Sequence, residues 1–132
     1  MSRLVTSAAL FAARAHEGQT RKDGRTPYVH HVLEVADLVA CADAGELEIA
    51  AALLHDTVED SATTIEDVSR RFGPRVAQIV GGLTDDPAWD ALPRPERKSR
   101  QAEHMRQATR SVRLVKIADQ ASNLRDVARL PD

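Results

Sequence analysis

The sequence AALLHDTVED, residues 51–60, joins an apolar run to a cluster of chemically reactive side chains. Its apolar half predicts a buried helical segment. If the helix continues through the stretch, His55 lies one turn before Glu59. Asp56 then lies one turn before Asp60. Two side chains of metal-ligand type beside two carboxylates indicate a metal held next to a proton-transfer group. The alternative is an ordinary polar helix end with solvated carboxylates.

The chain has 132 residues, which is sufficient for one domain with its own core, so we expect a single domain over residues 1–132. Aromatic residues make up only 3% of the sequence. The core must therefore come mainly from Ala, Leu, Val and Ile. Because these residues recur at helical spacing, the sequence predicts an all-α protein.

The sequence has no feature of a membrane or secreted protein. No apolar run approaches the roughly 18 residues of a membrane-spanning helix, and no secretion signal is evident at the N-terminus. Cys41 is the single cysteine and cannot form an internal disulfide. We therefore expect a cytoplasmic protein in which Cys41 is a small core residue.

The apolar periodicity predicts about seven helices with short connections. They are expected at residues 4–15, after Pro27, at residues 51–60, 65–72, 76–83 and 96–108, and from Ser111 onwards. Thr63 and Glu66 predict a capping box at the start of the fourth helix. Residues 18–27 and 84–95 are rich in turn-forming and charged residues, which predicts exposed loops.

Charge is distributed unevenly along the chain. The net charge of −2 argues against general nucleic-acid binding. Residues 34–67 contain ten carboxylates and no Lys or Arg, whereas residues 94–116 contain eight basic residues and two Glu. An acidic segment suits a cation and a basic segment suits an anionic substrate. The alternative for both segments is a set of solvated helix faces.

Candidate metal ligands fall in three predicted helices. They are His30 or His31 in the second, His55 and Asp56 in the third, and Asp119 in the last. Asp119 follows the largely apolar segment 114–118, so it must be paired or metal-bound if it is buried. The alternative is an exposed carboxylate. Asn123 follows one turn later on the same face. A mixed His and Asp set suits Mn²⁺, Fe²⁺ or Zn²⁺.

Longer motifs surround these candidates. They are Ala15-His16-x-Gly18-Gln19-x-Arg21-Lys22, Thr26-Pro27-Tyr28-x-x-His31, Leu54-His55-Asp56-Thr57-Val58-Glu59-Asp60, Gly82-Leu83-Thr84 and Val115-Lys116-Ile117-Ala118-Asp119-x-x-x-Asn123-Leu124-Arg125-Asp126. In order and spacing they resemble the hydrolase domain of the RelA/SpoT family of HD-domain phosphohydrolases. The resemblance is strongest to the stand-alone small alarmone hydrolases, and it covers roughly residues 4–127.

The resemblance implies a compact HD-domain helical bundle that removes the 3′-pyrophosphate of guanosine tetra- or pentaphosphate with Mn²⁺ or another divalent transition metal. The implied metal ligands are His31, His55, Asp56 and Asp119. His31 is preferred to His30 because the family ligand lies four residues after the proline.

The resemblance also implies roles for residues around the metal. Glu59 and Asp60 match the pair that handles water and proton transfer. Arg21 and Lys22 match loop residues that hold the nucleotide, and Asn123 matches a substrate contact. From the residues alone, Arg21 and Lys22 would be an ordinary charged loop. His16 matches a motif position for which we expect a structural role.

Two further functions stay open at this point. One is hydrolysis of another nucleotide, such as an adenosine alarmone or a dinucleotide phosphate. The other is a metal-holding module without turnover. The sequence continues only six residues beyond Asp126, whereas the small alarmone hydrolases continue further. Unless a second subunit completes the pocket, we therefore expect an open base pocket and a guanosine preference below about 100-fold. The sequence does not determine oligomeric state, physiological metal or preferred base.

Overall fold

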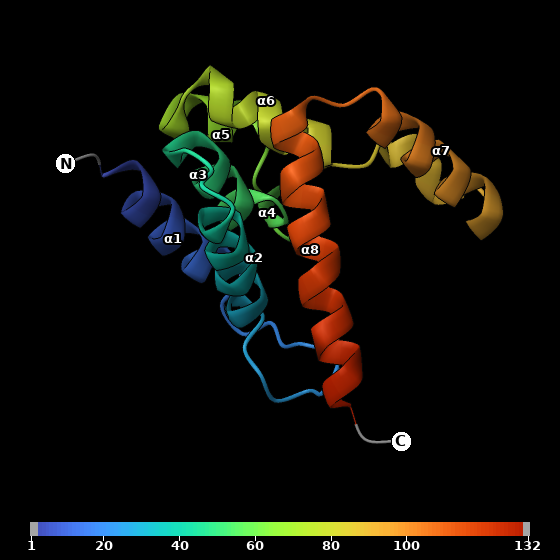
Figure 1. Ribbon diagram of the computed structural model, residues 1–132, viewed down its shortest axis with the longest axis horizontal. Coiled ribbons are helices and arrows are strands. Elements are labelled where there is room, and N and C mark those ends of the chain that lie inside the picture. The colour runs from blue at the N-terminus through green and yellow to red at the C-terminus, as the bar shows by residue number, and fades with distance from the viewer. Residues whose placement is uncertain (1–2, 131–132) are drawn as a thin grey trace.

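The computed structural model describes residues 3–130 as an all-α bundle (Figure 1). Its helices are α1 (Leu4–Ala15), α2 (Val29–Cys41), α3 (Glu46–Leu54), α4 (Thr57–Asp60), α5 (Ile65–Phe72), α6 (Pro74–Leu83), the 3-10 helix η1 (Pro87–Ala91), α7 (Arg94–Arg106) and α8 (Arg110–Arg129). Within residues 3–130, extended pairing is limited to one bridge between Thr20 and Pro27. The predicted all-α bundle of about seven helices is confirmed, with the short α4 as an additional turn.

Helix α3 lies at the centre of the bundle and packs against α1, α2, α6 and α8. The reason is in its sequence, because residues 50–54 are all buried. A helix that is apolar around its circumference is stable only in the interior. Three consecutive alanines let neighbouring helices approach closely. The centre of the bundle therefore leads directly to His55.

The helix starts are mostly where the sequence predicts them, with local corrections. Helix α5 begins at Ile65 as expected, but the capping box uses Thr64 and Asp67 instead of Thr63 and Glu66. The Asp67 backbone N–H donates to Thr64 Oγ1 over 3.1 Å, and the Thr64 N–H donates back to the Asp67 carboxylate. The predicted capping pair was therefore wrong by one residue.

The expectation that Cys41 is a core residue was wrong, because Cys41 is exposed. Helix α2 buries a stripe that ends at Val39. A residue two positions later points roughly to the opposite side of a helix. The packing of α2 therefore turns Cys41 away from the core.

The region after α6 also differs from the predicted loop at residues 84–95. It contains η1, and α7 already begins at Arg94. Helix α7 extends away from the rest of the bundle in Figure 1. The rings of Trp89 in η1 and His104 in α7 lie 5.9 Å apart at 73°. Among the helices of residues 3–130, none has the length and apolar character needed to cross a membrane.

Candidate metal centre

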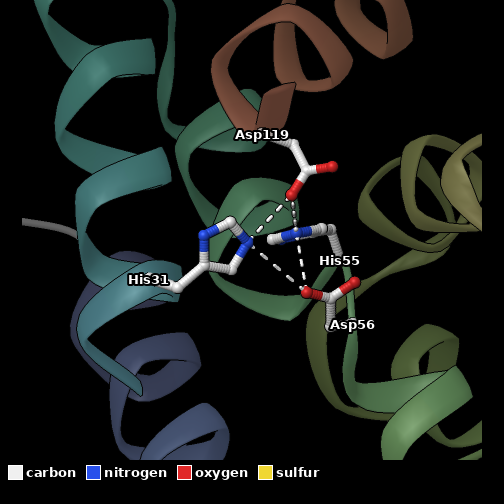
Figure 2. Close-up of side chains that lie close together, drawn as sticks. All are labelled: His31, His55, Asp56 and Asp119. Atoms are coloured by element: carbon white, nitrogen blue, oxygen red, sulfur yellow. Dashed lines mark hydrogen bonds and ion pairs between the residues drawn. The ribbon is translucent and has the colours of Figure 1, made fainter. Parts of the chain in front are cut away.

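Four side chains from three parts of the bundle converge on one point (Figure 2). His31 lies in the first turn of α2, His55 and Asp56 lie between α3 and α4, and Asp119 lies in α8. Their nearest ligand-type atoms all lie within 4.8 Å of one another. Nε2 of His31 is 2.8 Å from Oδ1 of Asp119. The structure thus brings together all four residues predicted as ligands, whereas His30 is exposed outside this group.

The chain turns at His55 because side chains replace helical hydrogen bonds. Helix α3 ends at Leu54, so the expectation of a continuous helix through Asp60 was wrong. Thr57 Oγ1 donates to the Leu54 carbonyl over 2.7 Å, and His55 Nδ1 lies 2.5 Å from the Ala52 carbonyl. These contacts satisfy carbonyls that a helix end leaves without partners. The turn places His55 and Asp56 side by side at the cluster.

The hydrogen bond of His55 determines which ring nitrogen carries its proton. A carbonyl oxygen only accepts, so Nδ1 donates to Ala52 and Nε2 of the neutral ring presents a lone pair. That Nε2 lies 2.9 Å from Oδ2 of Asp56 and 3.1 Å from Oδ1 of Asp119. Carboxylate oxygens also only accept. Three acceptors therefore converge where a positive charge is required.

A second proton on Nε2 of His55 is one way to supply this positive charge, and the pKa shifts show its effect. Burial alone lowers the pKa of His55, but hydrogen bonds from the ring to Asp119 and Asp56 outweigh it and raise the pKa to about 10. Burial alone raises the pKa of Asp119 and Asp56. Hydrogen bonds from His31 and His55 nevertheless lower the pKa of Asp119, and those from His55 and Tyr28 lower the pKa of Asp56. Both carboxylates are thus held ionised around a site that favours a cation.

His31 is oriented from behind by Ser122. Its Nδ1 lies 2.9 Å from Ser122 Oγ, and both residues are buried. Donation from Nδ1 to this hydroxyl leaves Nε2 free to face Asp119 and Asp56. Metal-binding histidines in proteins are usually held by such an outer hydrogen bond. The sequence places Ser122 on the buried stripe of α8 but gives no indication of this contact, which spans 91 residues.

The carboxylates of Glu59 and Asp60 lie beside the cluster in α4. The Asp60 N–H donates to the Asp56 carbonyl over 2.9 Å, so Asp60 follows Asp56 by one helical turn. Oε1 of Glu59 accepts from the Asp85 N–H over 2.8 Å. Burial, together with neighbouring negative charges, raises the pKa of both Glu59 and Asp60. Both groups are therefore shifted towards the neutral pH range in which a proton acceptor operates best.

The predicted nucleotide-binding residues meet at the other end of α8. Arg21 forms an ion pair through Nε with Asp126, and its Nη2 donates to Asn123 Oδ1 over 3.0 Å. In Figure 1 the loop between α1 and α2 reaches the C-terminal part of α8, where these contacts form. The structure thus brings Arg21 and Asn123 together. Asp126 was not predicted as a partner, and residues separated by about a hundred positions carry no local signal of pairing.

A hollow of about 510 Å³ opens between this loop, the start of α2 and the end of α8. Its lining carries both signs of charge, with His31 and Ser122 on the side of the cluster; the charged residues are Arg21, Lys22 and Arg25 and the carboxylates of Asp23, Glu34 and Asp126. Lys22 is exposed. The hollow therefore borders the imidazole of His31 and carries cationic side chains with carboxylates among them.

The chain matches known proteins along most of its length. The family model described as HD domain matches residues 8–132. The guanosine-3′,5′-bis(diphosphate) 3′-pyrophosphohydrolase MESH1 of Xenopus tropicalis is 45% identical over 131 residues, which cover 96% of this chain and 70% of the relative. The enzyme of the same name from Homo sapiens is 45% identical over 129 residues, covering 95% and 70%.

A solved structure agrees with the sequence relatives. It is described as "A metazoan ortholog of SpoT hydrolyzes ppGpp and plays a role in starvation responses". It superposes with a TM-score of 0.87 and is 37% identical, with 97% of this chain and 72% of the other chain covered. The family model, the sequence relatives and the shared architecture agree, and the chain belongs to the HD-domain family, in the group that contains the MESH1 hydrolases.

Proposed function

We propose that this protein is a metal-dependent hydrolase that removes the 3′-pyrophosphate from guanosine tetra- and pentaphosphate. The observation that carries the proposal is the convergence of His31, His55, Asp56 and Asp119 in a chain 45% identical to enzymes named for this reaction. The chain spans about 70% of those relatives. The remaining residues around the cluster have the charges that the reaction needs.

The donor set fits a divalent transition metal. Two imidazole nitrogens and two ionised carboxylates suit Mn²⁺, Fe²⁺ or Zn²⁺ better than Mg²⁺, and we propose Mn²⁺. His31 and His55 would bind through Nε2, since the Nδ1 atoms face Ser122 and the Ala52 carbonyl. When bound, such an ion lowers the pKa of water and polarises a phosphoryl oxygen.

Glu59 and Asp60 are proposed to take the proton of the water that attacks phosphorus and to deliver it to the 3′-oxygen, whose bond to phosphorus breaks. Their raised pKa values make both carboxylates stronger bases than ordinary surface acids. The Asp85 N–H holds one oxygen of Glu59 and leaves the other for this task. Proton transfer by a carboxylate in such a position contributes typically 10²- to 10⁴-fold to turnover.

Lys22 and Arg21 are proposed to bind the nucleotide along this hollow, together with Asn123, which accepts a hydrogen bond from Arg21. Arg21 forms an ion pair with Asp126, which neutralises part of the Arg21 charge and fixes the direction of the Arg21 side chain. Lys22 is exposed and keeps its full charge for a phosphate group. We therefore assign charge compensation mainly to Lys22, and orientation of the nucleotide to Arg21 and Asn123.

The expected cytoplasmic location of the protein stays a prediction.

The direct test is a panel of nucleotides incubated with the Mn²⁺-loaded protein, with products separated by chromatography. The proposal predicts guanosine diphosphate and pyrophosphate from guanosine tetraphosphate. A sample stripped of metal with a chelator, and the variant Asp119→Asn, serve as controls that should release no pyrophosphate. Release of pyrophosphate only from an adenosine alarmone would redirect the substrate assignment. No release from any nucleotide would contradict the assignment of a hydrolase.

A further inference from the structure

Tyr28 touches the cluster at the point where the loop before α2 ends. Its hydroxyl donates a 2.6 Å hydrogen bond to Oδ2 of Asp56. The same oxygen faces Nε2 of His55 at 2.9 Å and Nε2 of His31 at 3.7 Å. The hydroxyl therefore acts on the oxygen that points to the centre of the cluster.

The ring of Tyr28 is fixed on several sides. The His16 ring lies 4.9 Å away, and Cζ of Arg21 lies 5.4 Å above the ring centre. The backbone N–H of Tyr28 donates to the Gln19 carbonyl over 2.8 Å. These contacts to the backbone and the ring restrict Tyr28, so its hydroxyl stays directed towards the carboxylates beside the cluster. Asp56 is thus held by a group that has little freedom of its own.

A second chain of contacts joins this loop to α4. Gln19 Nε2 donates to the Asp60 carbonyl over 2.9 Å, which directs Gln19 Oε1 towards His16 Nδ1 at 2.9 Å. Since the amide oxygen accepts, His16 donates from Nδ1. The end of α1, the loop and α4 are therefore connected as one unit. This unit places Tyr28 against the turn that carries Asp56.

We propose that Tyr28 is a positioning residue of the metal centre, which holds the Asp56 ligand oxygen in place without binding the ion itself. The inference rests on the proposed function, because it requires Asp56 to be a metal ligand. A carboxylate without this hydrogen bond is free to rotate its oxygens away from the two Nε2 atoms. Loss of such an outer contact typically weakens metal binding 10- to 100-fold.

The variant Tyr28→Phe tests this by removing the hydroxyl and keeping the ring. Calorimetric titration with Mn²⁺ alone, without nucleotide, should show a dissociation constant roughly 10- to 100-fold higher. Thr84→Val is the control, because it removes a half-buried hydroxyl that donates to the Val80 carbonyl, in a segment that carries none of the four proposed ligands. Its Mn²⁺ affinity should stay within about twofold, as expected of an uncoupled site.

Turnover separates positioning from direct contact with substrate. The Tyr28 hydroxyl also lies near the Asp60 carboxylate. If Tyr28 nevertheless acts through metal binding alone, excess Mn²⁺ should restore most of the turnover of Tyr28→Phe. A deficit that persists at saturating Mn²⁺ would overturn the inference, as would an unchanged dissociation constant in the folded variant. An equal loss in Thr84→Val would also overturn it, since both changes would then act by general destabilisation.

The wild-type protein gives an independent measurement, because Tyr28 is its only tyrosine. With fluorotyrosine incorporated, the single ¹⁹F signal should broaden in step with the first equivalent of paramagnetic Mn²⁺. A signal unaffected when calorimetry shows that Mn²⁺ has bound would contradict contact between Tyr28 and the metal centre. If the wild-type protein binds no Mn²⁺ at all, the proposed metal centre fails, which is a different result from failure of the Tyr28 assignment.

Discussion

Helices α3 and α7 represent two opposite ways of placing functional side chains. Helix α3 is surrounded by four other helices, and its last five residues are buried. Along α7, which the structure describes completely, no residue is buried. Helix α3 ends at His55 and Asp56, whereas α7 carries six of the basic and imidazole side chains: Arg94, Arg97, Lys98, Arg100, His104 and Arg106.

The difference follows from what each chemistry tolerates. The ligand atoms of a metal site must be positioned to within a fraction of an ångström of the geometry that the metal requires. Such side chains are therefore placed where close packing fixes them. Charges that attract phosphate act over longer distances and stay effective on a solvated helix. The bundle therefore predicts rigid ligands at the end of α3 and adaptable charge compensation at exposed positions such as Lys22. The predictions below test each side of this contrast.

The largest effect is expected at the rigid end. His55→Ala removes an imidazole from the cluster and leaves the Asp56 and Asp119 carboxylates with one histidine, so bound metal should be lost. Turnover should fall by at least roughly 10³-fold, since a catalytic metal is worth several kcal/mol. Elemental analysis after dialysis checks the metal content. His30 is exposed and precedes the proposed ligand His31, so the control variant His30→Ala should keep its metal. Unchanged metal content in His55→Ala would refute the ligand assignment.

The next largest effect is expected from Glu59→Gln. This change keeps the shape of the side chain but removes its basicity. Turnover should fall by roughly 10²- to 10⁴-fold while the metal content stays near normal. Steady-state kinetics on metal-quantified samples checks both quantities. Turnover close to that of the wild-type protein would transfer the proton-handling role to Asp60.

Packing itself distinguishes the two helices. Ala51→Leu adds volume to the centre of α3, where Ala51 has no exposed surface, and should cost about 1–3 kcal/mol of unfolding free energy. Ala102→Leu makes the same change on the exposed helix α7 and should change the unfolding free energy by less than about 0.5 kcal/mol. Urea unfolding of both variants provides the measurement. Equal costs would contradict the contrast between a packed α3 and a solvated α7.

The smallest effect is expected from an exposed charge. Lys22→Gln should raise the KM for guanosine tetraphosphate roughly fivefold, because one exposed charge pair contributes about 1 kcal/mol. The effect should shrink as salt is added. Arg70→Gln, an exposed charge on α5 that pairs with Asp67, is the control and should leave KM unchanged. A change in turnover without a change in KM would place Lys22 in the chemical step.

Much of the fold and of the candidate site was predictable from local patterns. The buried stripes of α2, α5 and α8 follow directly from apolar spacing, and the four cluster residues were identified from their types and motifs. The division between α3 and α4 was not predictable, because it depends on hydrogen bonds from the side chains of His55 and Thr57 to backbone carbonyls. Apolar spacing in the sequence does not distinguish such bonds from a continuing helix.

Contacts between distant segments were the other missing part. Three such contacts link elements that only the folded chain brings together: Tyr28 with Asp56, His31 with Ser122, and Arg21 with Asp126. Sequence patterns identify which side chains can bind a metal or a phosphate. They do not show which neighbours fix the direction of those side chains.

The central claim is that His31, His55, Asp56 and Asp119 hold one divalent ion. A crystal structure with Mn²⁺, with its position found from anomalous scattering, tests this most directly. The account predicts a single strong peak bonded to both Nε2 atoms and to one oxygen of each carboxylate. A peak bonded to other residues, or Mn²⁺ bound in solution with no peak among these four side chains, would contradict it.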